Sequence, residues 1–189
     1  MAAVLIASVA IVPTATASPA SADIGPCGDS GQWFGPYWWG SVGATNGGIP
    51  YGYRNRMVLT ADDWYGGHIH QDGNANQMWY MDCIGYDYGQ GSRIIQFRLA
   101  SDPSRCLTAY AAYAGTTLDY CQDDPYSGQA FEQWGIGEAY VDYEGYDVWA
   151  NAFYSPTYGQ CLDVFNGDWW NDTQVIVWDC HFGANQLWY

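Results

Sequence analysis

The sequence contains no lysine and only five arginines, against 20 acidic residues, so its formal net charge is −15 at pH 7. A surface with this charge repels phosphate backbones, which argues against nucleic-acid binding. It also disfavours association with anionic membranes and with sulfated or uronic-acid polymers. We therefore expect the partners of this protein among neutral or cationic molecules.

Long hydrophobic segments are also scarce. One apolar run, from Ala2 to Val12, has 11 residues, whereas a membrane-spanning helix needs about 20. Small residues follow it and end in Ala20-Ser21-Ala22, which is typical of a secretory signal peptide and its cleavage site. We therefore expect residues 1–22 to be a signal peptide, residues 23–189 to form one domain, and the protein to be secreted. Because no basic residue precedes the run, the true start could instead lie upstream of Met1, or the N-terminus could stay tethered.

Signatures of catalysis are missing as well. There is no Gly-x-Ser-x-Gly elbow and no His-Glu-x-x-His motif. The six cysteines lack the clustered spacing of a metal site, and in an exported chain they are expected to form three disulfides, which leaves no thiol as nucleophile. Carboxylates such as Glu138, Asp142 and Glu144 are abundant, but at this net charge most must be solvated. We therefore expect that the protein is not an enzyme and that it binds neither a metal ion nor a cofactor.

What the sequence does contain is a repeated motif. Asn76-Gln77-Met78-Trp79 recurs as Asn185-Gln186-Leu187-Trp188, and a weaker copy, Phe131-Glu132-Gln133-Trp134, lies between them. The three tryptophans are separated by 55 and then 54 residues. A fixed period of this kind indicates one structural unit repeated three times, here about residues 25–79, 80–134 and 135–189. We expect all three tryptophans to lie in the core.

Two other positions recur in each unit and frame a strand-like segment. Frequent turn residues, including 23 glycines, and the absence of long helical periodicity predict an all-β protein. The opening position holds Val58, Cys106 and Cys161, and the closing position holds His70, Cys121 and Cys180. We therefore expect three disulfides: Cys106–Cys121 and Cys161–Cys180 from the repeat, and Cys27–Cys83 by elimination.

Three short motifs of the last unit, in this order and spacing, resemble the ricin-B-type lectin family. They are Cys161-Leu162-Asp163-Val164, Val177-Trp178-Asp179-Cys180 and the terminal Asn185-Gln186-Leu187-Trp188. The resemblance covers residues 58–189 clearly and residues 25–57 by period alone. It implies a β-trefoil, in which three units close a six-stranded barrel capped by three hairpins. It also implies binding of a neutral carbohydrate, for which galactose- and xylose-type ligands are common in the family.

In that family each unit can hold a sugar in a shallow pocket, where an aspartate accepts hydroxyl hydrogen bonds, an aromatic ring stacks and an asparagine donates. One aromatic platform with a few fixed polar groups suits a pyranose. Ile176 departs from this pattern, since the family often has a glutamine there. Phe165, Trp169 and Trp170 could add a second stacking surface. The residues that match in the third unit are Asp163 as acceptor, Trp178 as platform, Asn185 as donor, Gln186 behind Asp163, and His181 at the rim.

The first two units lack both the acceptor aspartate and the aromatic platform. The acceptor and platform positions hold Thr60 and His68 in the first unit, and Thr108 and Asp119 in the second. We therefore predict one sugar site, in the third unit. Each of its residues also has an ordinary structural interpretation, as a turn former or strand aromatic. His68 and His70 share a strand face, but a core role suits them better than metal binding.

An alternative function stays open at this point. A trefoil with two eroded pockets could be a non-catalytic interaction protein of the protease-inhibitor or protein-ligand type, because fold alone does not determine function. A lectin with a single weak site would also need several copies, or a partner protein, to reach useful avidity. The sequence therefore leaves room for an oligomer or a separate partner subunit.

Overall fold

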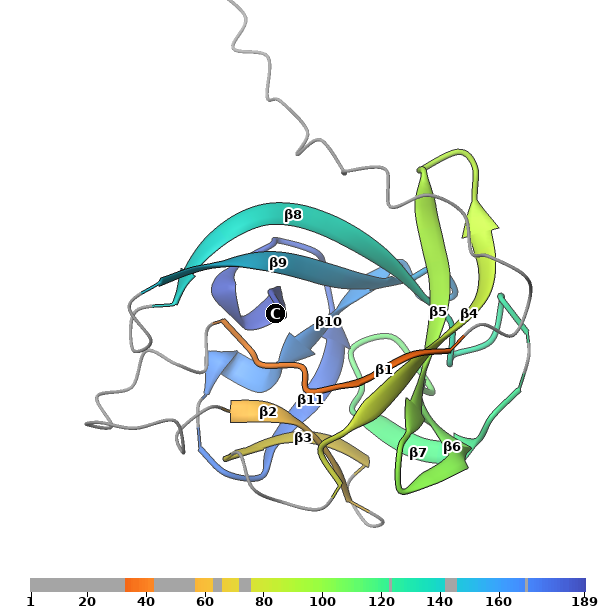
Figure 1. Ribbon diagram of the computed structural model, residues 1–189, viewed down its shortest axis with the longest axis horizontal. Helices are drawn as coiled ribbons and strands as arrows, with labels where there is room; N and C mark the ends of the chain where they lie inside the picture. The colour runs from red at the N-terminus through yellow and green to blue at the C-terminus, as the bar shows by residue number, and fades with distance from the viewer. Residues whose placement is uncertain are drawn as a thin grey trace, which may run out of the picture.

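A computed structural model describes residues 33–42, 57–62, 66–71, 76–122, 124–141, 146–168 and 170–189 (Figure 1). Within these ranges the chain forms eleven β-strands and two short 3-10 helices, η2 (Phe165–Gly167) and η3 (Ala184–Gln186). The prediction of an all-β protein is therefore confirmed. The predicted signal peptide, and Cys27 of the predicted Cys27–Cys83 pair, lie outside the described residues.

Long antiparallel strands form the barrel. β4 (Trp79–Asp87) pairs with β5 (Ser92–Leu99), and β8 (Phe131–Val141) pairs with β9 (Tyr146–Ser155). Figure 1 shows β8 and β9 as one long, curved pair. β1 (Trp33–Tyr37) adds to β4, and β5 joins β8.

The barrel closes through the last tryptophan. Trp188 forms antiparallel bridges both to Asn151, in β9, and to Ser41, which follows β1. Its backbone N–H donates to the Asn151 carbonyl over 2.9 Å, and its carbonyl accepts the Asn151 N–H over 2.7 Å. The end of the chain therefore completes the barrel that the first strand begins.

Three shorter hairpins meet around a common axis: β2 (Met57–Asp62) with β3 (Gly66–Gln71), β6 (Asp102–Ala109) with β7 (Thr116–Tyr120), and β10 (Gln160–Val164) with β11 (Thr173–Trp178). The Thr116 hydroxyl lies 2.9 Å from the Val175 carbonyl and 3.5 Å from that of Gly67, one neighbour in each other hairpin. A Cβ on Gly67 would lie 2.4 Å from this hydroxyl oxygen, so only glycine allows the approach.

Aromatic side chains fill the barrel. Phe97 and Phe153 pack edge to face with ring centroids 4.7 Å apart, and Trp39 packs on Phe153 at 4.9 Å. Such edge-to-face pairs stabilise the core beyond their buried area, by about 0.5–1.5 kcal/mol each. Two of the three predicted core tryptophans, Trp79 and Trp188, are fully buried.

The glutamine of each repeated motif makes an equivalent hydrogen bond. Gln77 Nε2 donates to Thr60 Oγ1 over 3.2 Å, and Gln186 Nε2 donates to Asp163 Oδ2 over 2.7 Å. In the second unit, however, the residue that donates to Thr108 Oγ1 is Gln129, over 3.0 Å. The second motif is therefore Gln129-Ala130-Phe131, three residues before the position predicted from the period.

The prediction that Trp134 lies in the core is wrong. Phe131 is the fully buried aromatic and begins β8, as Trp79 begins β4. Trp134 is only partly buried, stacks on Tyr154 with ring centroids 4.5 Å apart, and donates through Nε1 to Glu132 over 3.0 Å. The boundary between the second and third units accordingly falls near Phe131.

Disulfides join the ends of two of the short hairpins. Cys106–Cys121 and Cys161–Cys180 both form, with Cα–Cα distances of 5.0 and 5.1 Å. Both pairings deduced from the repeat are confirmed. They hold β6 to the end of β7 and β10 to the end of β11.

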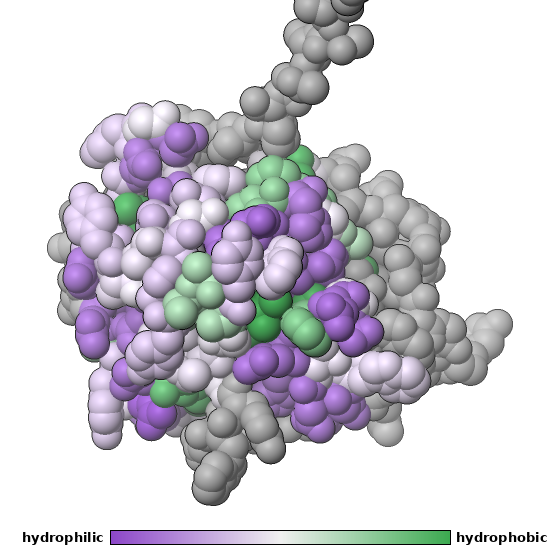
Figure 2. All heavy atoms as spheres, turned by 180° about the vertical axis from the view of Figure 1, so that it is seen from behind, coloured by the Kyte–Doolittle hydropathy of each residue, from purple (hydrophilic) through white to green (hydrophobic). Residues whose placement is uncertain are grey.

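Large aromatic residues also face solvent. Figure 2 shows one face of the molecule, where hydrophilic and intermediate residues predominate and hydrophobic residues gather in small patches. Several exposed aromatics belong to two neighbouring hairpins, β6–β7 and β10–β11, or to their connecting loops, namely Tyr110, Tyr113, Phe165, Trp170 and Trp178. These two hairpins therefore concentrate aromatic rings that solvent can reach.

Candidate functional site

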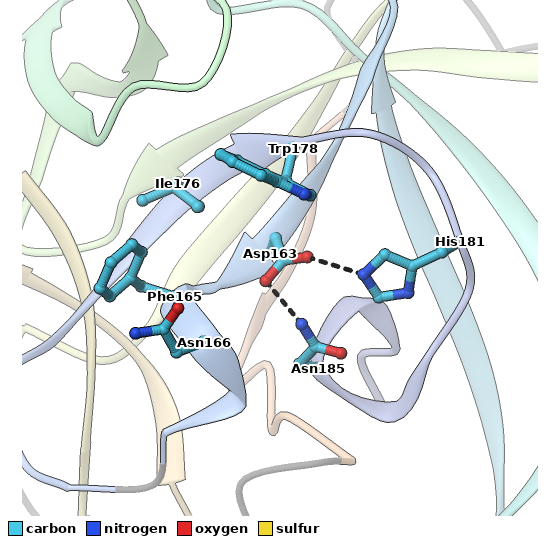
Figure 3. Close-up of a pocket in the computed structure, with 7 residues that line it drawn as sticks. All are labelled: Asp163, Phe165, Asn166, Ile176, Trp178, His181 and Asn185. Atoms are coloured by element: carbon cyan, nitrogen blue, oxygen red, sulfur yellow. Dashed lines mark hydrogen bonds and ion pairs between the residues drawn. The ribbon is translucent and has the colours of Figure 1, made fainter.

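The β10–β11 hairpin holds the predicted acceptor and platform on one face. Cys161 pairs with Trp178, and Asp163 pairs with Ile176. Because side chains alternate along a strand, these four residues point to the same side of the hairpin. Here a pocket of about 210 Å³ opens, lined by Asp163, Phe165, Asn166, Ile176, Trp178, His181 and Asn185 (Figure 3).

Asp163 lies at the centre of the pocket and is 2% exposed. Its Oδ1 accepts a hydrogen bond from Asn185 Nδ2 over 2.7 Å, and its Oδ2 accepts one from Gln186 Nε2, also over 2.7 Å. Burial raises the pKa of Asp163 above its ordinary value, while these hydrogen bonds and the nearby His181 act in the opposite direction. The carboxylate is thus held in one orientation by two amides.

Gln186 supports this carboxylate from behind and does not line the pocket. Its Oε1 accepts the backbone N–H groups of His181 and Phe182 over 2.9 and 3.1 Å, and its Nε2 also donates to the Asp179 carbonyl over 2.9 Å. One buried glutamine therefore fixes both Asp163 and the loop that follows β11.

His181 stands at the edge of the pocket, with about half of its side chain exposed. Its Nδ1 accepts the Gly183 N–H over 2.9 Å, so in the neutral ring the proton lies on Nε2. Nε2 lies 3.4 Å from Asp163 Oδ2. The imidazole therefore presents a donor toward the carboxylate, as Figure 3 shows.

Trp178 forms one wall of the pocket and is 42% exposed. Ile176, opposite Asp163, closes the floor between Trp178 and Phe165. Phe165 lines the pocket as anticipated, Trp170 is exposed but does not line it, and Trp169 lies outside the described residues. The site thus offers two aromatic surfaces with a carboxylate between them.

Two nearby residues were not predicted. Asn166 lines the pocket with a left-handed backbone (φ 57°), for which the Asn-Gly pair at 166–167 was an available sequence signal. Tyr113, from the β6–β7 loop, packs edge to face on Trp178 with ring centroids 4.8 Å apart. No sequence signal pointed to this contact, because it joins two different units.

In the second unit, the position that corresponds to Trp178 holds an acidic residue. Asp119 pairs with Cys106, as Trp178 does with Cys161, so an acid replaces the platform. The Tyr110 hydroxyl donates to this carboxylate across the hairpin. Gly128 precedes the motif glutamine, and a Cβ there would lie 1.9 Å from the Ala109 carbonyl oxygen, so no asparagine fits.

The first unit requires a correction of register. Val58 pairs with His70, which puts His70 in the platform position, while His68 pairs with Thr60 and corresponds to Ile176. The prediction that His68 takes the platform position and His70 the closing-cysteine position is therefore wrong by two residues. His68 is buried and His70 is partly buried, so neither offers an open ring like that of Trp178.

The structure thus brings together Asp163, Trp178, Asn185 and His181 in one pocket, with Gln186 behind them. Their part in ligand binding stays a prediction. Within the described ranges, no group of three or more His, Cys, Asp or Glu side chains is arranged to hold a metal ion. In the same part of the chain, no helix has the length and apolar character needed to cross a membrane.

Solved structures with a similar fold exist. A designed threefold-symmetric protein, ThreeFoil, matches 80% of this chain and 94% of its own length, with 16% identity and a TM-score of 0.56. The ricin B-like lectin of Macrolepiota procera, solved in complex with lactose, matches 86% of this chain and 96% of its own, with 21% identity and a TM-score of 0.50. No protein-family model matches the chain, and a search of curated proteins finds no match. At these identities the similarity shows the fold, and the chain is a β-trefoil, as its sequence predicts, of the type found in a ricin B-like lectin.

Proposed function

We propose that the protein is a non-catalytic lectin that binds a neutral glycan in the pocket of its third unit. The observation that carries this proposal is a buried, doubly hydrogen-bonded carboxylate, Asp163, in the same pocket as a half-exposed indole, Trp178. A pyranose has C–H groups on one face and hydroxyls around its rim. An aromatic wall beside fixed polar groups matches both features.

Asp163 has room for a sugar hydroxyl. An ionised carboxylate offers about four acceptor positions, and Asn185 and Gln186 each occupy one. A hydroxyl can take a remaining position, next to His181 or in its place. The amide nitrogen of Asn185 also carries a second N–H, which can donate to a neighbouring hydroxyl. Asp163 and Asn185 together therefore suit two adjacent hydroxyls of one ring.

The pocket composition favours binding over hydrolysis. Glycosidases use a pair of carboxyl groups on either side of the scissile bond. Among the residues that line this pocket, Asp163 alone carries a carboxyl group, and three side chains surround it as donors. An arrangement of this kind holds a ground-state ligand and supplies no second carboxyl group.

The net charge of the protein and the residues that line the pocket favour one class of ligand. The net charge of −15 disfavours anionic saccharides, and Ile176 replaces a polar contact with an apolar one. The similar trefoil from Macrolepiota procera was solved with lactose, which supports a galactose-type or related neutral sugar. The two disulfides are compatible with an extracellular protein, and we propose secretion through residues 1–22.

The test is a glycan array, followed by calorimetry with the best neutral ligand and with xylan, cellulose and chitin. A shallow pocket is expected to bind with about −4 to −5 kcal/mol, corresponding to millimolar or somewhat tighter affinity. Trp178→Ala should weaken binding at least about tenfold through loss of buried apolar surface. Trp170→Ala is the matched control, because Trp170 is also exposed but lies outside the pocket lining.

Equal binding by wild type and Trp178→Ala would contradict this site. Silence of wild type on every neutral glycan, together with tight capture of one protein partner, would favour the alternative of a trefoil that recognises proteins. A single weak site would also gain from multivalency. Sedimentation or light scattering should therefore accompany the binding assay, to establish whether the chain acts as an oligomer.

A further inference from the structure

The loop between β6 and β7 reaches across from the second unit and contacts the pocket wall of the third. Tyr113, in this loop, packs on Trp178 with a ring-centroid distance of 4.8 Å and an interplanar angle of 79°. Its hydroxyl donates to Asp179 Oδ1 over 2.8 Å. Asp179 directly follows Trp178 in the sequence. The ring and the hydroxyl of Tyr113 therefore both contact the end of β11 that carries the indole.

The backbone of Tyr113 is held in an unusual conformation. Its φ is +60°, which non-glycine residues adopt rarely and which clusters at binding sites. The backbone N–H donates to Gln160 Oε1 over 2.9 Å, and Gln160 Nε2 lies 3.4 Å from the same Asp179 oxygen. Gln160 is buried. Hydrogen bonds at both ends of the residue and a ring contact therefore fix Tyr113 beside the pocket.

Tyr113 nevertheless stays open to solvent. It is 55% exposed and Trp178 is 42% exposed, so the contact between them covers only part of each ring. The exposed carboxylate of Asp179 lies next to Tyr113, as the carboxylate of Asp163 lies next to Trp178. An aromatic ring with an adjacent acceptor thus occurs twice, once in the pocket and once beyond its Trp178 wall.

We propose that Tyr113 and Asp179 form a second sugar subsite, so that the natural ligand is a neutral oligosaccharide and not a single sugar. This inference rests on the proposed function of the pocket. One ring binds at Asp163 and Trp178, and the next ring of the chain packs on Tyr113 with a hydroxyl directed to Asp179. Same-face residues on a strand are about 7 Å apart, so the surface from Ile176 past Trp178 to Tyr113 extends beyond one ring.

The test compares ligands of different length. Galactose and xylose, with their β-linked di- and trisaccharides, are titrated by calorimetry into wild type, Tyr113→Gly and Tyr113→Phe. Glycine accepts a positive φ without strain, so Tyr113→Gly removes the ring while the loop keeps its conformation. Phenylalanine keeps the ring and loses the hydroxyl. Circular dichroism and thermal melting check that both variants fold.

Wild type should bind the trisaccharide about tenfold more tightly than the monosaccharide, in whichever series binds. Tyr113→Gly should lose this gain and keep the monosaccharide affinity, and Tyr113→Phe should keep most of the gain. Equal affinity for all lengths in wild type would overturn the second subsite and leave the first intact. Equal weakening of every ligand in Tyr113→Gly would also overturn it, since Tyr113 would then only support Trp178. Absence of binding to any saccharide would overturn the proposed function itself.

Discussion

The side-chain amide of Gln129 donates a hydrogen bond to the hydroxyl of Thr108 over 3.0 Å. The same amide donates to the Tyr120 carbonyl, and its oxygen accepts the Gln122 N–H. Gln186 makes the matching contacts in the third unit, but there the acceptor is the carboxylate of Asp163. The same set of glutamine hydrogen bonds therefore occurs in both units. The acceptor is a structural threonine in the second unit and a candidate binding residue, Asp163, in the third.

This equivalence predicts the effect of Asp163→Thr. Thr60 and Thr108 occupy the same position and accept from their own glutamines, so threonine should keep the Gln186 bond and change the free energy of unfolding by only about 1 kcal/mol. Glycan binding should fall at least about tenfold, because the charged acceptor is lost. Thermal melting and calorimetry measure the two effects. Asp168→Thr, at an exposed aspartate outside the pocket lining, should change neither.

The buried carboxylate also predicts how binding depends on pH. Burial raises the pKa of Asp163, and its protonated form loses acceptor capacity. Affinity should therefore decline as the pH falls through this raised value, at a higher pH than the ordinary aspartate value of about 3.9. Titrations over about pH 3 to 7 test this expectation. Binding that stays constant until the protein unfolds would contradict a role for the carboxylate.

The contribution of Asp163 to the free energy of unfolding should change with pH in the opposite direction to the affinity: it should increase as the pH falls. A carboxyl group whose pKa is higher in the folded state than in the unfolded chain stabilises the fold below the unfolded value, and this contribution is lost as pH rises through the folded value. Wild type should therefore gain stability relative to Asp163→Thr as the pH is lowered through that window. Urea denaturation of both proteins at several pH values measures the difference. The difference between the two proteins reports the carboxylate together with its contact to His181.

The assignment of the second motif can be checked by two truncations. Phe131→Ala should cost about 3–5 kcal/mol, because it opens a cavity in the barrel. Trp134→Ala should cost less, about 1–2 kcal/mol, since that indole is only partly buried and stacks on Tyr154. Chemical denaturation gives both values. The reverse order would restore Trp134 as the core residue of the unit.

The two described disulfides should differ in their functional effect. Replacing either pair by serines should cost about 3 kcal/mol on the chain-entropy estimate, because they close loops of similar length, 15 and 19 residues. Only loss of Cys161–Cys180 should also weaken glycan binding, since it joins β10 to the end of β11 beside Trp178. Removal of Cys106–Cys121 is the control. Equal loss of binding in both variants would point to a general loosening of the fold.

The threefold β-trefoil was predictable because its period, cysteine spacing and terminal motif are local and repeated. The position of the second motif was not, because a chance similarity to Gln-x-Trp at Glu132-Gln133-Trp134 lies three residues after the true motif Gln129-Ala130-Phe131. Phenylalanine serves in the core as well as tryptophan, so burial and not residue type distinguishes the two.

The first unit was misaligned for a related reason. It lacks the paired cysteines that mark the hairpin register in the other units, and the pairing of Val58 with His70 becomes visible only in the sheet. Asp163, Trp178, His181 and Asn185 were predicted from the sequence and lie together in the pocket, because they all belong to one unit. Tyr113 was not, since its contact with Trp178 joins residues from different units.

The most direct test of the binding site is an NMR titration that follows the indole N–H signals of the tryptophans as a neutral saccharide is added. The signal of Trp178 should shift in a saturable manner, while those of the buried Trp79 and Trp188 and of the exposed Trp38 stay in place. Shifts confined to other tryptophans, or no shift with any saccharide that the protein binds, would contradict a sugar site beside Asp163.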